Sequence, residues 1–205
     1  SAKEIAMRVE NLRVGERVQD VTFFFRCGEI LGLAGLIGSG RTETLRAIFG
    51  ADPKESGEIF LSEQPIKIKR PSDAVRAGIG LVPEDRKHDG LLLPQPIRVN
   101  TTLNTMPRHA NRFGWIDSAA EATTTGSFCD QLNVRRDSIE QKIGELSGGN
   151  QQKVVIARWL ARNCDVLLFD EPTRGIDVAA KDTIYQLLRD LAAAGKAIVV
   201  VSSEL

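Results

Sequence analysis

The order of hydrophobic and polar positions along the chain predicts strands that alternate with helices. Strands are predicted over the first 34 positions, and the β-branched and aromatic run at 21–25 is typical of a strand. A second apolar run, 29–34, leads into a glycine-rich loop, and a helix is predicted over 42–49 with Gly50 as its C-terminal stop. The further elements predicted from this pattern are a hairpin over 57–69, a short helix over 72–77, a strand over 79–82, a helix over 150–162, a strand over 165–170, a helix over 179–194 and a strand over 197–201.

A region in the middle of the chain interrupts this order. From 85 to 144 the pattern is mixed, polar and helical, with loops expected around Pro94, Pro96 and Pro107. We expect an inserted helical subdomain here. Because strands and helices alternate on both sides of it, the sequence predicts an α/β fold with a mostly parallel sheet that is covered on both faces.

Composition narrows the class of protein. The chain has 205 residues, enough for about one domain with an insertion; 42% are hydrophobic and the formal net charge is zero. A balanced charge argues against general nucleic-acid binding, and the basic run 67–70 is interpreted as a solvated strand edge. Three cysteines without a C-x-x-C pair and two histidines offer no zinc spacing, so we expect reduced thiols. The chain starts without methionine and stops after a strand-like run, which we interpret as a piece of a longer protein.

The glycine-rich stretch Gly35-Leu-Ile-Gly-Ser-Gly-Arg-Thr-Glu43 predicts a phosphate-binding loop. Its spacing fits G-x-x-x-x-G-K-[ST], and Thr42 stands where a magnesium-binding hydroxyl belongs. Gly38 and Gly40 allow backbone N–H groups to close on a phosphate at the positive end of the following helix. Arg41 stands at the lysine position, so the stretch is open to two interpretations, a nucleotide site or an ordinary turn between strand and helix.

Two adjacent carboxylates favour the nucleotide site. The run Val166-Leu-Leu-Phe-Asp170-Glu171 is an apolar strand with an acidic end, and such an end lies at the edge of the sheet beside a phosphate loop. Asp170 can hold magnesium, and Glu171 can polarise an attacking water. An ordinary acidic strand end is the alternative, but it leaves the glycine-rich loop unexplained.

The stretch Leu146-Ser-Gly-Gly-Asn-Gln-Gln152 leads directly into an apolar helix. Ser147 and the two glycines after it predict a second anion-binding helix start. Because one γ-phosphate has no use for two such helix ends from one chain, we expect this one to serve a nucleotide held by another subunit. Trp159, further along the helix, is interpreted as a packing residue.

Taken together, the motifs resemble the nucleotide-binding domain of an ATP-binding-cassette (ABC) transporter over essentially the whole chain. Residues 146–152 look like the ABC signature, and 170–177 resemble a Walker B strand followed by a D-loop. The closer likeness is to the C-terminal cassette of the double-cassette ATPases of bacterial sugar importers, of the ribose, galactose, xylose, arabinose and autoinducer-2 type. The sequence motifs at 38–43, at 82–87 with 89–91, and at 170–177 are similar to the motifs of that subgroup.

The resemblance implies a P-loop NTPase (RecA-like) α/β core with an N-terminal antiparallel β layer. This core would be formed by 1–84 and 151–205, with its C-terminal end truncated, and the helical subdomain that carries the signature by 85–150. The implied cofactors are ATP and Mg²⁺. The implied site residues are Gly35, Gly38, Ser39, Gly40, Arg41, Thr42 and Glu43 at the phosphates; Thr42, Asp170 and Glu84 at magnesium; Glu171 as candidate base with Ser203 at the switch-histidine position; and, in trans, Ser147, Gly148, Gly149 and Asn150.

Several positions depart from a working ATPase of this family. Arg41 replaces lysine with a broader, planar fork, Glu84 replaces the Q-loop glutamine, and Ser203 replaces the switch histidine. No aromatic residue stands near 12–14, where the family stacks adenine; stacking of a base is worth ~1–3 kcal/mol in nucleic-acid complexes. Because positioning and charge stabilisation supply nearly all the rate of phosphoryl transfer, we expect a site that binds ATP and hydrolyses it poorly.

The resemblance also implies partners: the N-terminal cassette of the same polypeptide, transmembrane permease subunits and, indirectly, a periplasmic sugar-binding protein. Since no apolar run approaches the ~18 residues of a membrane span, we expect the chain to reach the cytoplasmic face of the bacterial inner membrane through these partners and to power carbohydrate import. The alternatives are a fully active ATPase cassette, and a soluble ABC protein of DNA repair or translation. The lack of a basic surplus counts against the second, and no nucleic-acid partner is expected.

Overall fold

The computed structural model describes residues 4–36 and 38–203; Ile37 of the glycine-rich loop and residues 204–205 lie outside this part. Contacts divide the chain into two compact units. Unit 1 comprises 1–84, 164–172 and 185–205, and unit 2 comprises 85–163 and 173–184. The predicted boundaries assign 151–163 to the α/β core, whereas by contacts this segment groups with the helices of unit 2, because the helix that contains it packs on other helices.

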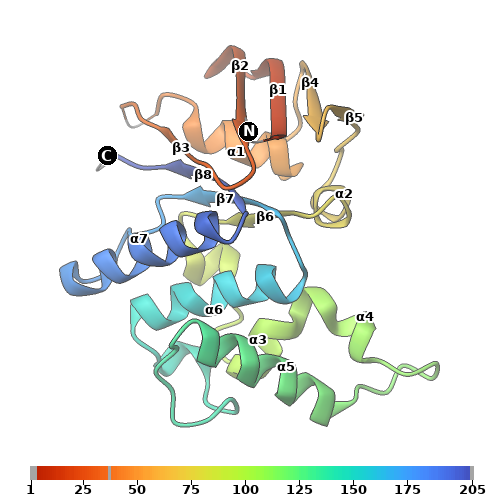
Figure 1. Ribbon diagram of the computed structural model, residues 1–205, viewed down its shortest axis with the longest axis vertical. Coiled ribbons are helices and arrows are strands. Elements are labelled where there is room, and N and C mark those ends of the chain that lie inside the picture. The colour runs from red at the N-terminus through yellow and green to blue at the C-terminus, as the bar shows by residue number, and fades with distance from the viewer. Residues whose placement is uncertain (1–3, 37, 204–205) are drawn as a thin grey trace. The chain divides into compact units, whose positions relative to one another are not determined.

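An antiparallel sheet forms the N-terminal layer of unit 1. Its strands are β1 (Ile5–Val14), β2 (Val18–Arg26), β4 (Ser56–Leu61) and β5 (Gln64–Ile66), in the order β2-β1-β4-β5 (Figure 1). The hairpin predicted over 57–69 is therefore present, but its second strand ends at Ile66. The interpretation of the basic run 67–70 as a strand edge is wrong: Ile68 within it is buried, at 5% exposure, and holds this segment as a loop against the core.

A parallel sheet forms the second layer of unit 1. Its strands are β3 (Ile30–Leu33), β8 (Ala197–Val201), β7 (Val166–Asp170) and β6 (Ile79–Val82), in the order β3-β8-β7-β6. Every residue of β6, β7 and β8 is buried. Strands that are covered on both faces have no polar alternation, which explains why they stand out in the sequence as continuous apolar runs.

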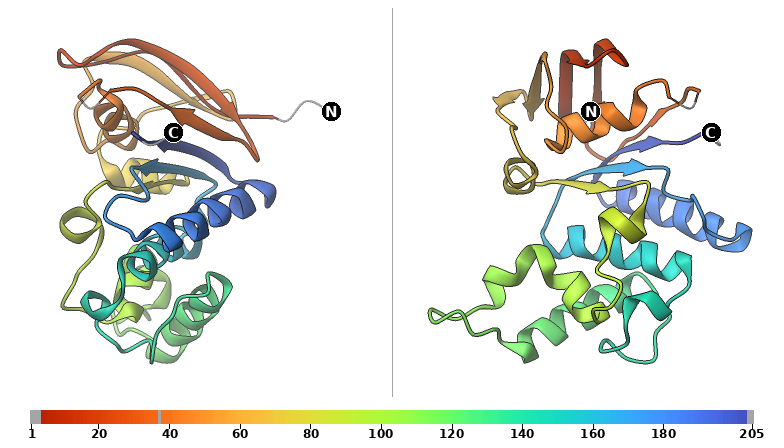
Figure 2. Two further views of the ribbon diagram at one scale, coloured as in Figure 1. Left: turned by 90° about the vertical axis from the view of Figure 1, so that its left-hand side faces the viewer. Right: turned by 180° about the vertical axis from the view of Figure 1, so that it is seen from behind.

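Helices cover both faces of the parallel sheet within unit 1. Helix α1 (Arg41–Phe49) contacts β1 and β2 of the antiparallel sheet as well as β6 and β7, so it lies between the two sheets (Figure 2). The second part of α7 (Val178–Ala193) lies on the other face of the parallel sheet. The short α2 (Pro71–Arg76) leads into β6. Among the described residues, no helix is both long enough and apolar enough to cross a membrane.

Unit 2 consists of helices packed around α6. Helix α6 (Gly148–Ala161) contacts α3 (Ile97–Thr102), α5 (Ser118–Gln131) and two irregular turns. Unit 2 also contains the π-helical turn η1 (Arg86–Gly90), the 3₁₀ turns η2 (Leu103–Thr105) and η3 (Ile143–Glu145), α4 (Met106–His109) and the first part of α7. Trp159 of α6 is 6% exposed, which confirms its interpretation as a packing residue.

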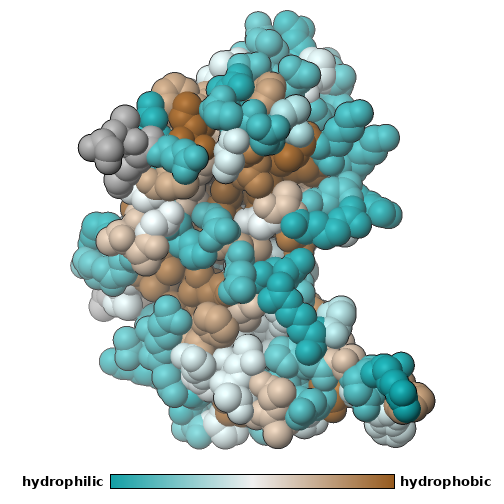
Figure 3. Space-filling view, turned by 45° about the vertical axis from the view of Figure 1, so that its right-hand side comes forward, coloured by the Kyte–Doolittle hydropathy of each residue, from teal (hydrophilic) through white to brown (hydrophobic). Residues whose placement is uncertain are grey.

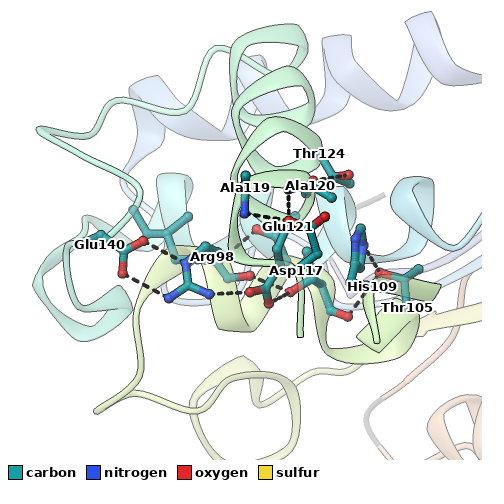
Figure 4. Close-up of polar contacts among 12 residues, drawn as sticks. Arg98, Thr105, His109, Asp117, Ala119, Ala120, Glu121, Thr124 and Glu140 are labelled. Atoms are coloured by element: carbon teal, nitrogen blue, oxygen red, sulfur yellow. Dashed lines mark hydrogen bonds and ion pairs between the residues drawn. The ribbon is translucent and has the colours of Figure 1, made fainter. Parts of the chain in front are cut away.

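A charged network ties the outer helices of unit 2 together. Figure 4 shows Arg98 of α3 between two carboxylates, Glu121 of α5 and Glu140 of the following loop. Glu121 is 1% exposed and also accepts a hydrogen bond from Thr102. A buried carboxylate is tolerated because it has both a cationic and a hydroxyl partner.

A short hairpin over 110–116 projects from unit 2 and carries exposed aromatic side chains. Ala110 pairs with Ile116, and the Asn111 carboxamide oxygen accepts hydrogen bonds from the backbone N–H groups of Phe113 and Trp115. Phe113 and Trp115 are 71% and 76% exposed. Figure 3 shows hydrophobic and hydrophilic residues side by side on the segment that projects at its lower right.

Candidate nucleotide site

The glycine-rich loop connects β3 to the first residue of α1. Gly40 is the N-cap of α1 with φ 84°, and a Cβ there would lie 2.4 Å from the carbonyl oxygen of Arg17, so only glycine fits. Gly38 has φ 82° but open space around it. The start of α1 has no side-chain cap, which leaves its positive end to an anion.

The Arg41 side chain is turned back onto the sheet edge. Its Nη1 donates to the carbonyl oxygen of Ser202 at 2.7 Å, and its Nη2 donates to that of Leu36 at 3.4 Å. The same Nη2 lies 4.0 Å from Oε1 of Glu171, and the side chain is only 11% exposed. The guanidinium thus bridges the loop to the end of β8 and to the candidate base.

Thr42 and Asp170 are joined by a direct hydrogen bond. The Thr42 Oγ1 donates to Asp170 Oδ1 at 3.0 Å, and Asp170 is 2% exposed at the end of β7. Burial raises the pKa of Asp170 to about 6; the Thr42 hydroxyl opposes this shift, and the neighbouring charge of Glu171 adds to it. A nearby cation would remove the cost of ionising this carboxylate.

Glu171 is held in an uncommon backbone conformation. Its φ is 45°, in the left-handed region, while its N–H donates to the carbonyl oxygen of Val201 at 2.9 Å. Its Oε2 accepts a hydrogen bond from Ser203 Oγ at 3.3 Å. The structure therefore brings together the candidate base and the residue at the switch-histidine position.

The other predicted residues of this edge lie in different surroundings. Glu84 follows β6 by two residues, and Val82 at the end of β6 pairs with Phe169, so Glu84 lies at the same edge of the sheet as Asp170. Glu43 points elsewhere: its carboxylate pairs with Arg17 at 2.5 Å, and this hydrogen bond lowers the pKa of Glu43.

The residues present fit magnesium with a nucleotide. A hydroxyl from Thr42 and a buried carboxylate from Asp170 are the hard oxygen donors that Mg²⁺ takes, usually one or two per site, with phosphate and water oxygens completing its shell. In the described ranges no group of three His, Cys, Asp or Glu residues could hold a metal ion.

The signature stretch lies in unit 2 at the start of α6. Ser147 is the N-cap, and its side chain makes no capping hydrogen bond to the helix; its Oγ instead accepts from Asn150 Nδ2 at 3.0 Å. Asn150 Oδ1 accepts from the N–H of Arg135 at 2.9 Å. A Cβ on Gly149 would lie 3.1 Å from Cβ of Ala180 in α7, so a larger residue would press on that helix.

An open groove of about 400 Å³ runs beside this helix start. It is lined by Ser147, Gly149, Asn150 and Lys153 of α6, by Asn133 and Arg135, and by Asp177, Ala180, Thr183 and Ile184. Lys153 Nζ donates to the carbonyl oxygen of Asn133 at 2.9 Å, and burial together with the charge of Arg135 lowers the pKa of Lys153. The two cations outnumber the one carboxylate of this lining, Asp177, and with the uncapped helix start they favour an anionic ligand.

Sequence reasoning missed three cations of the signature region. Arg135 and Lys153 belong to no motif, and only the fold places them in one groove. Arg86 stands within the motif 82–87, but no pattern in the sequence indicates that its side chain is buried and bonded to the D-loop. The one signal in the sequence for a role of Arg86 was the motif 82–87 itself, because such a specific charged sequence is unusual for a loop without a function.

Comparison with known sequences assigns the family. Residues 18–174 match the family described as ABC transporter. A ribose/galactose/methyl galactoside import ATP-binding protein of Burkholderia lata is 53% identical over 205 residues, all of this chain and 40% of that protein. A ribose import ATP-binding protein of Rhizobium meliloti is 52% identical over 198 residues, 97% of this chain and 39% of that protein. The chain thus spans about 40% of the length of these relatives.

Solved structures agree on the fold. A nucleotide-free ATP-binding cassette from an ABC transporter is similar with a TM-score of 0.82 and 21% identity, covering 97% of this chain and 81% of that one. A dimeric cassette in a post-hydrolysis state with ADP and phosphate has a TM-score of 0.77 and 25% identity, covering 96% and 87%. The P-loop NTPase architecture predicted from the sequence is therefore confirmed, and the chain belongs to the ABC transporter family.

Proposed function

We propose that this chain is an ATP-binding cassette of a bacterial sugar importer, in which its own nucleotide site binds Mg-ATP and hydrolyses it poorly. The names of the relatives from Burkholderia lata and Rhizobium meliloti support sugar import. As the chain spans about 40% of their length, we propose that a second cassette of the same polypeptide and membrane permease subunits are its partners. These partners would hold it at the cytoplasmic face of the inner membrane.

The proposal of poor hydrolysis rests mainly on the position of the Arg41 guanidinium. It donates to the carbonyl oxygens of Ser202 and Leu36, so part of its donor set is already used inside the chain. A serine hydroxyl, not an imidazole, contacts Glu171. Phosphoryl transfer depends on cations and hydrogen-bond donors that contact the transferring group. In this site the Arg41 cation is hydrogen-bonded within the chain, and Ser203 at the switch-histidine position is uncharged.

The residues of this site would divide the work as follows. Thr42 and Asp170 hold magnesium, whose charge neutralises the phosphate oxygens when it is bound. The uncapped start of α1 and the loop at Gly38 and Gly40 receive the phosphates. Glu171 orients a water through its carboxylate, but its contacts with Arg41 and Ser203 draw electron density away from that role.

The signature would serve a second nucleotide, held by the partner cassette. The uncapped start of α6 with Lys153 and Arg135 beside it forms an anion site in a unit separate from the loop at Gly40. The dimeric cassette with ADP and phosphate, similar in fold, supports a paired arrangement. In this arrangement the signature donates hydrogen bonds to the phosphate of a nucleotide whose main binding site is on the partner cassette.

Two variants of the full-length protein, assembled with permease and sugar-binding protein, test this division. Gly149→Asp adds a negative charge at the start of α6 and presses on Ala180 of α7. We expect sugar-stimulated ATPase activity to fall at least ~100-fold, the cost of one well-placed donor being roughly 2.7–4 kcal/mol. Glu171→Gln is expected to change the rate less than threefold. A crippled Glu171→Gln protein beside a normal Gly149→Asp protein would reverse the assignment of the two sites.

Restoring the family's residues tests the poor hydrolysis directly. We expect Arg41→Lys combined with Ser203→His to raise the ATP turnover of this cassette at least ~10-fold, because a free ammonium and an imidazole add positive charge at the transferring phosphate. The measurement is steady-state turnover in a full-length protein whose other site is silenced by Gly149→Asp. Arg76→Lys, a change on the exposed end of α2, serves as control. Equal turnover in the double variant and its parent would contradict the proposal.

A further inference from the structure

The side chain of Arg86 is buried in unit 2, and no carboxylate in the part of the chain that the structure describes pairs with it. The residue is 8% exposed, and its Nε has no hydrogen-bond partner within that same part. Its neighbour Asp85 accepts from His88 instead, and Arg86 belongs to no ion pair among the described residues. Burial lowers the pKa of Arg86. A buried cation with an unused donor costs free energy, so stability alone does not explain an arginine here.

The guanidinium of Arg86 holds the turn that begins the D-loop. Its Nη1 donates to the carbonyl oxygen of Arg174 at 2.8 Å and its Nη2 to that of Gly175 at 3.1 Å. The turn itself is closed by the N–H of Ile176, which donates to the carbonyl oxygen of Thr173 at 3.2 Å. A planar fork matches two consecutive carbonyls, which a single ammonium cannot do in the same geometry.

The same guanidinium lies directly behind the start of α6. A Cβ added to Gly148 would lie 2.6 Å from Arg86 Nη2 and 3.1 Å from the carbonyl oxygen of Gly175. The backbone of Gly148 therefore rests on Arg86 and on the D-loop turn at once. A cation at the positive end of a helix is unfavourable for the free helix, but both charges favour an anion bound there.

We propose that Arg86 is a positioning residue for the phosphate that the signature binds: it fixes the turn at 174–175 against Gly148 and adds a buried positive charge behind the start of α6. This inference rests on the proposed function of the signature. Arg86 does not touch the nucleotide; it acts through the backbone of Gly148 and the D-loop turn.

The test compares Arg86→Met and Arg86→Lys in the full-length protein assembled with permease and sugar-binding protein. For Arg86→Met we expect kcat to fall about 10–100-fold, by analogy with groups that orient metal ligands, while KM for ATP changes less than threefold. The orthovanadate concentration that half-inhibits turnover should be higher in Arg86→Met than in wild type. Arg86→Lys keeps the positive charge and loses the planar fork, so its kcat should lie between those of wild type and Arg86→Met. Amide hydrogen exchange of 173–177 should be faster in Arg86→Met than in wild type.

Arg158→Met is the matched control, because Arg158 is also a buried arginine of unit 2. It is 6% exposed and donates to Asn100 near the other end of α6. We expect this variant to keep kcat, vanadate inhibition and exchange of 173–177, whatever change its thermal stability shows. An equal loss of kcat in both variants, or wild-type exchange of 173–177 in Arg86→Met, would overturn the inference.

Gly149→Asp in the same assembly separates failure of this inference from failure of the proposed function. If Gly149→Asp abolishes turnover and Arg86→Met leaves kcat within twofold of wild type, Arg86 has no positioning role and the signature keeps its function. If Gly149→Asp itself leaves turnover normal, the signature does not act on a nucleotide. The proposed function then fails, and the inference about Arg86 fails with it.

Discussion

Among single residues, two neighbouring carboxylates have different environments. Asp170 is almost completely buried and bonded to the Thr42 hydroxyl, whereas Glu171 leaves the strand in a left-handed conformation and contacts Arg41 and Ser203. The buried one has a raised pKa, so its charge is costly until a cation neutralises it. Adjacent positions in the sequence thus divide into a candidate metal ligand and a candidate base.

The raised pKa of Asp170 predicts a pH dependence of stability. Between its unfolded value of 3.8 and its folded value of about 6, folded Asp170 keeps a proton that the unfolded chain has released. Its contribution to the free energy of unfolding therefore falls as pH rises through this window. Relative to Asp170→Asn, wild type should lose roughly 2 kcal/mol between pH 4 and pH 7. Urea denaturation with EDTA measures this; a difference that is constant with pH would contradict the raised pKa.

Among the elements, the short helix α3 depends on one buried amide. Helix α3 has six residues, too few to be stable alone. Asn100 within it is 0% exposed; its Nδ2 donates to the carbonyl oxygens of Leu92 and Pro96 at 3.1 Å, and its Oδ1 accepts from the N–H of Leu92 at 2.9 Å. Its Oδ1 and carbonyl oxygen also accept from Arg158 of α6. One side chain therefore fixes the loop before α3 and ties it to the central helix.

Removing this amide is predicted to be costly. We expect Asn100→Ala to lower the free energy of unfolding by roughly 3 kcal/mol, because buried backbone groups and the Arg158 guanidinium lose partners together. Asn104→Ala, one turn later and half-buried, should stay within about 0.5 kcal/mol of wild type. Chemical denaturation gives both values, and hydrogen exchange of 91–96 should rise only in the first variant. Similar losses in both variants would contradict this role.

At the scale of the whole molecule, the two units are stabilised in different ways. Unit 1 has a parallel sheet whose central strand β7 is buried at all five positions and paired on both sides. Unit 2 is built of helices with more polar contacts; only Glu121, Thr125 and Cys129 of the 14-residue α5 are buried. The density of buried apolar contacts is therefore lower at the edge of unit 2 than in the sheet.

Native-state hydrogen exchange should reflect this difference. We expect amides of α5 to exchange more than about tenfold faster than those of β7, because local opening follows the number of buried contacts that must break. Exchange measured by mass spectrometry, with peptides from both elements in one experiment, provides the comparison. Equal protection of α5 and β7 would show that the two units open together.

The sequence by itself determined the fold class and the buried strands, and it predicted a candidate site. Continuous apolar runs predicted β6, β7 and β8, and the glycine-rich loop with Asp170 and Glu171 predicted a phosphate and magnesium site, because burial and loop geometry leave local patterns. The direction of the long polar side chains, and the groups to which they are hydrogen-bonded, were decided only by the tertiary structure. Arg41 finds a carbonyl 161 positions away, Glu43 turns to Arg17, and Arg86 reaches the D-loop. A long polar side chain takes the nearest free donor or acceptor in space, and the backbone groups that supply it come from distant parts of the chain.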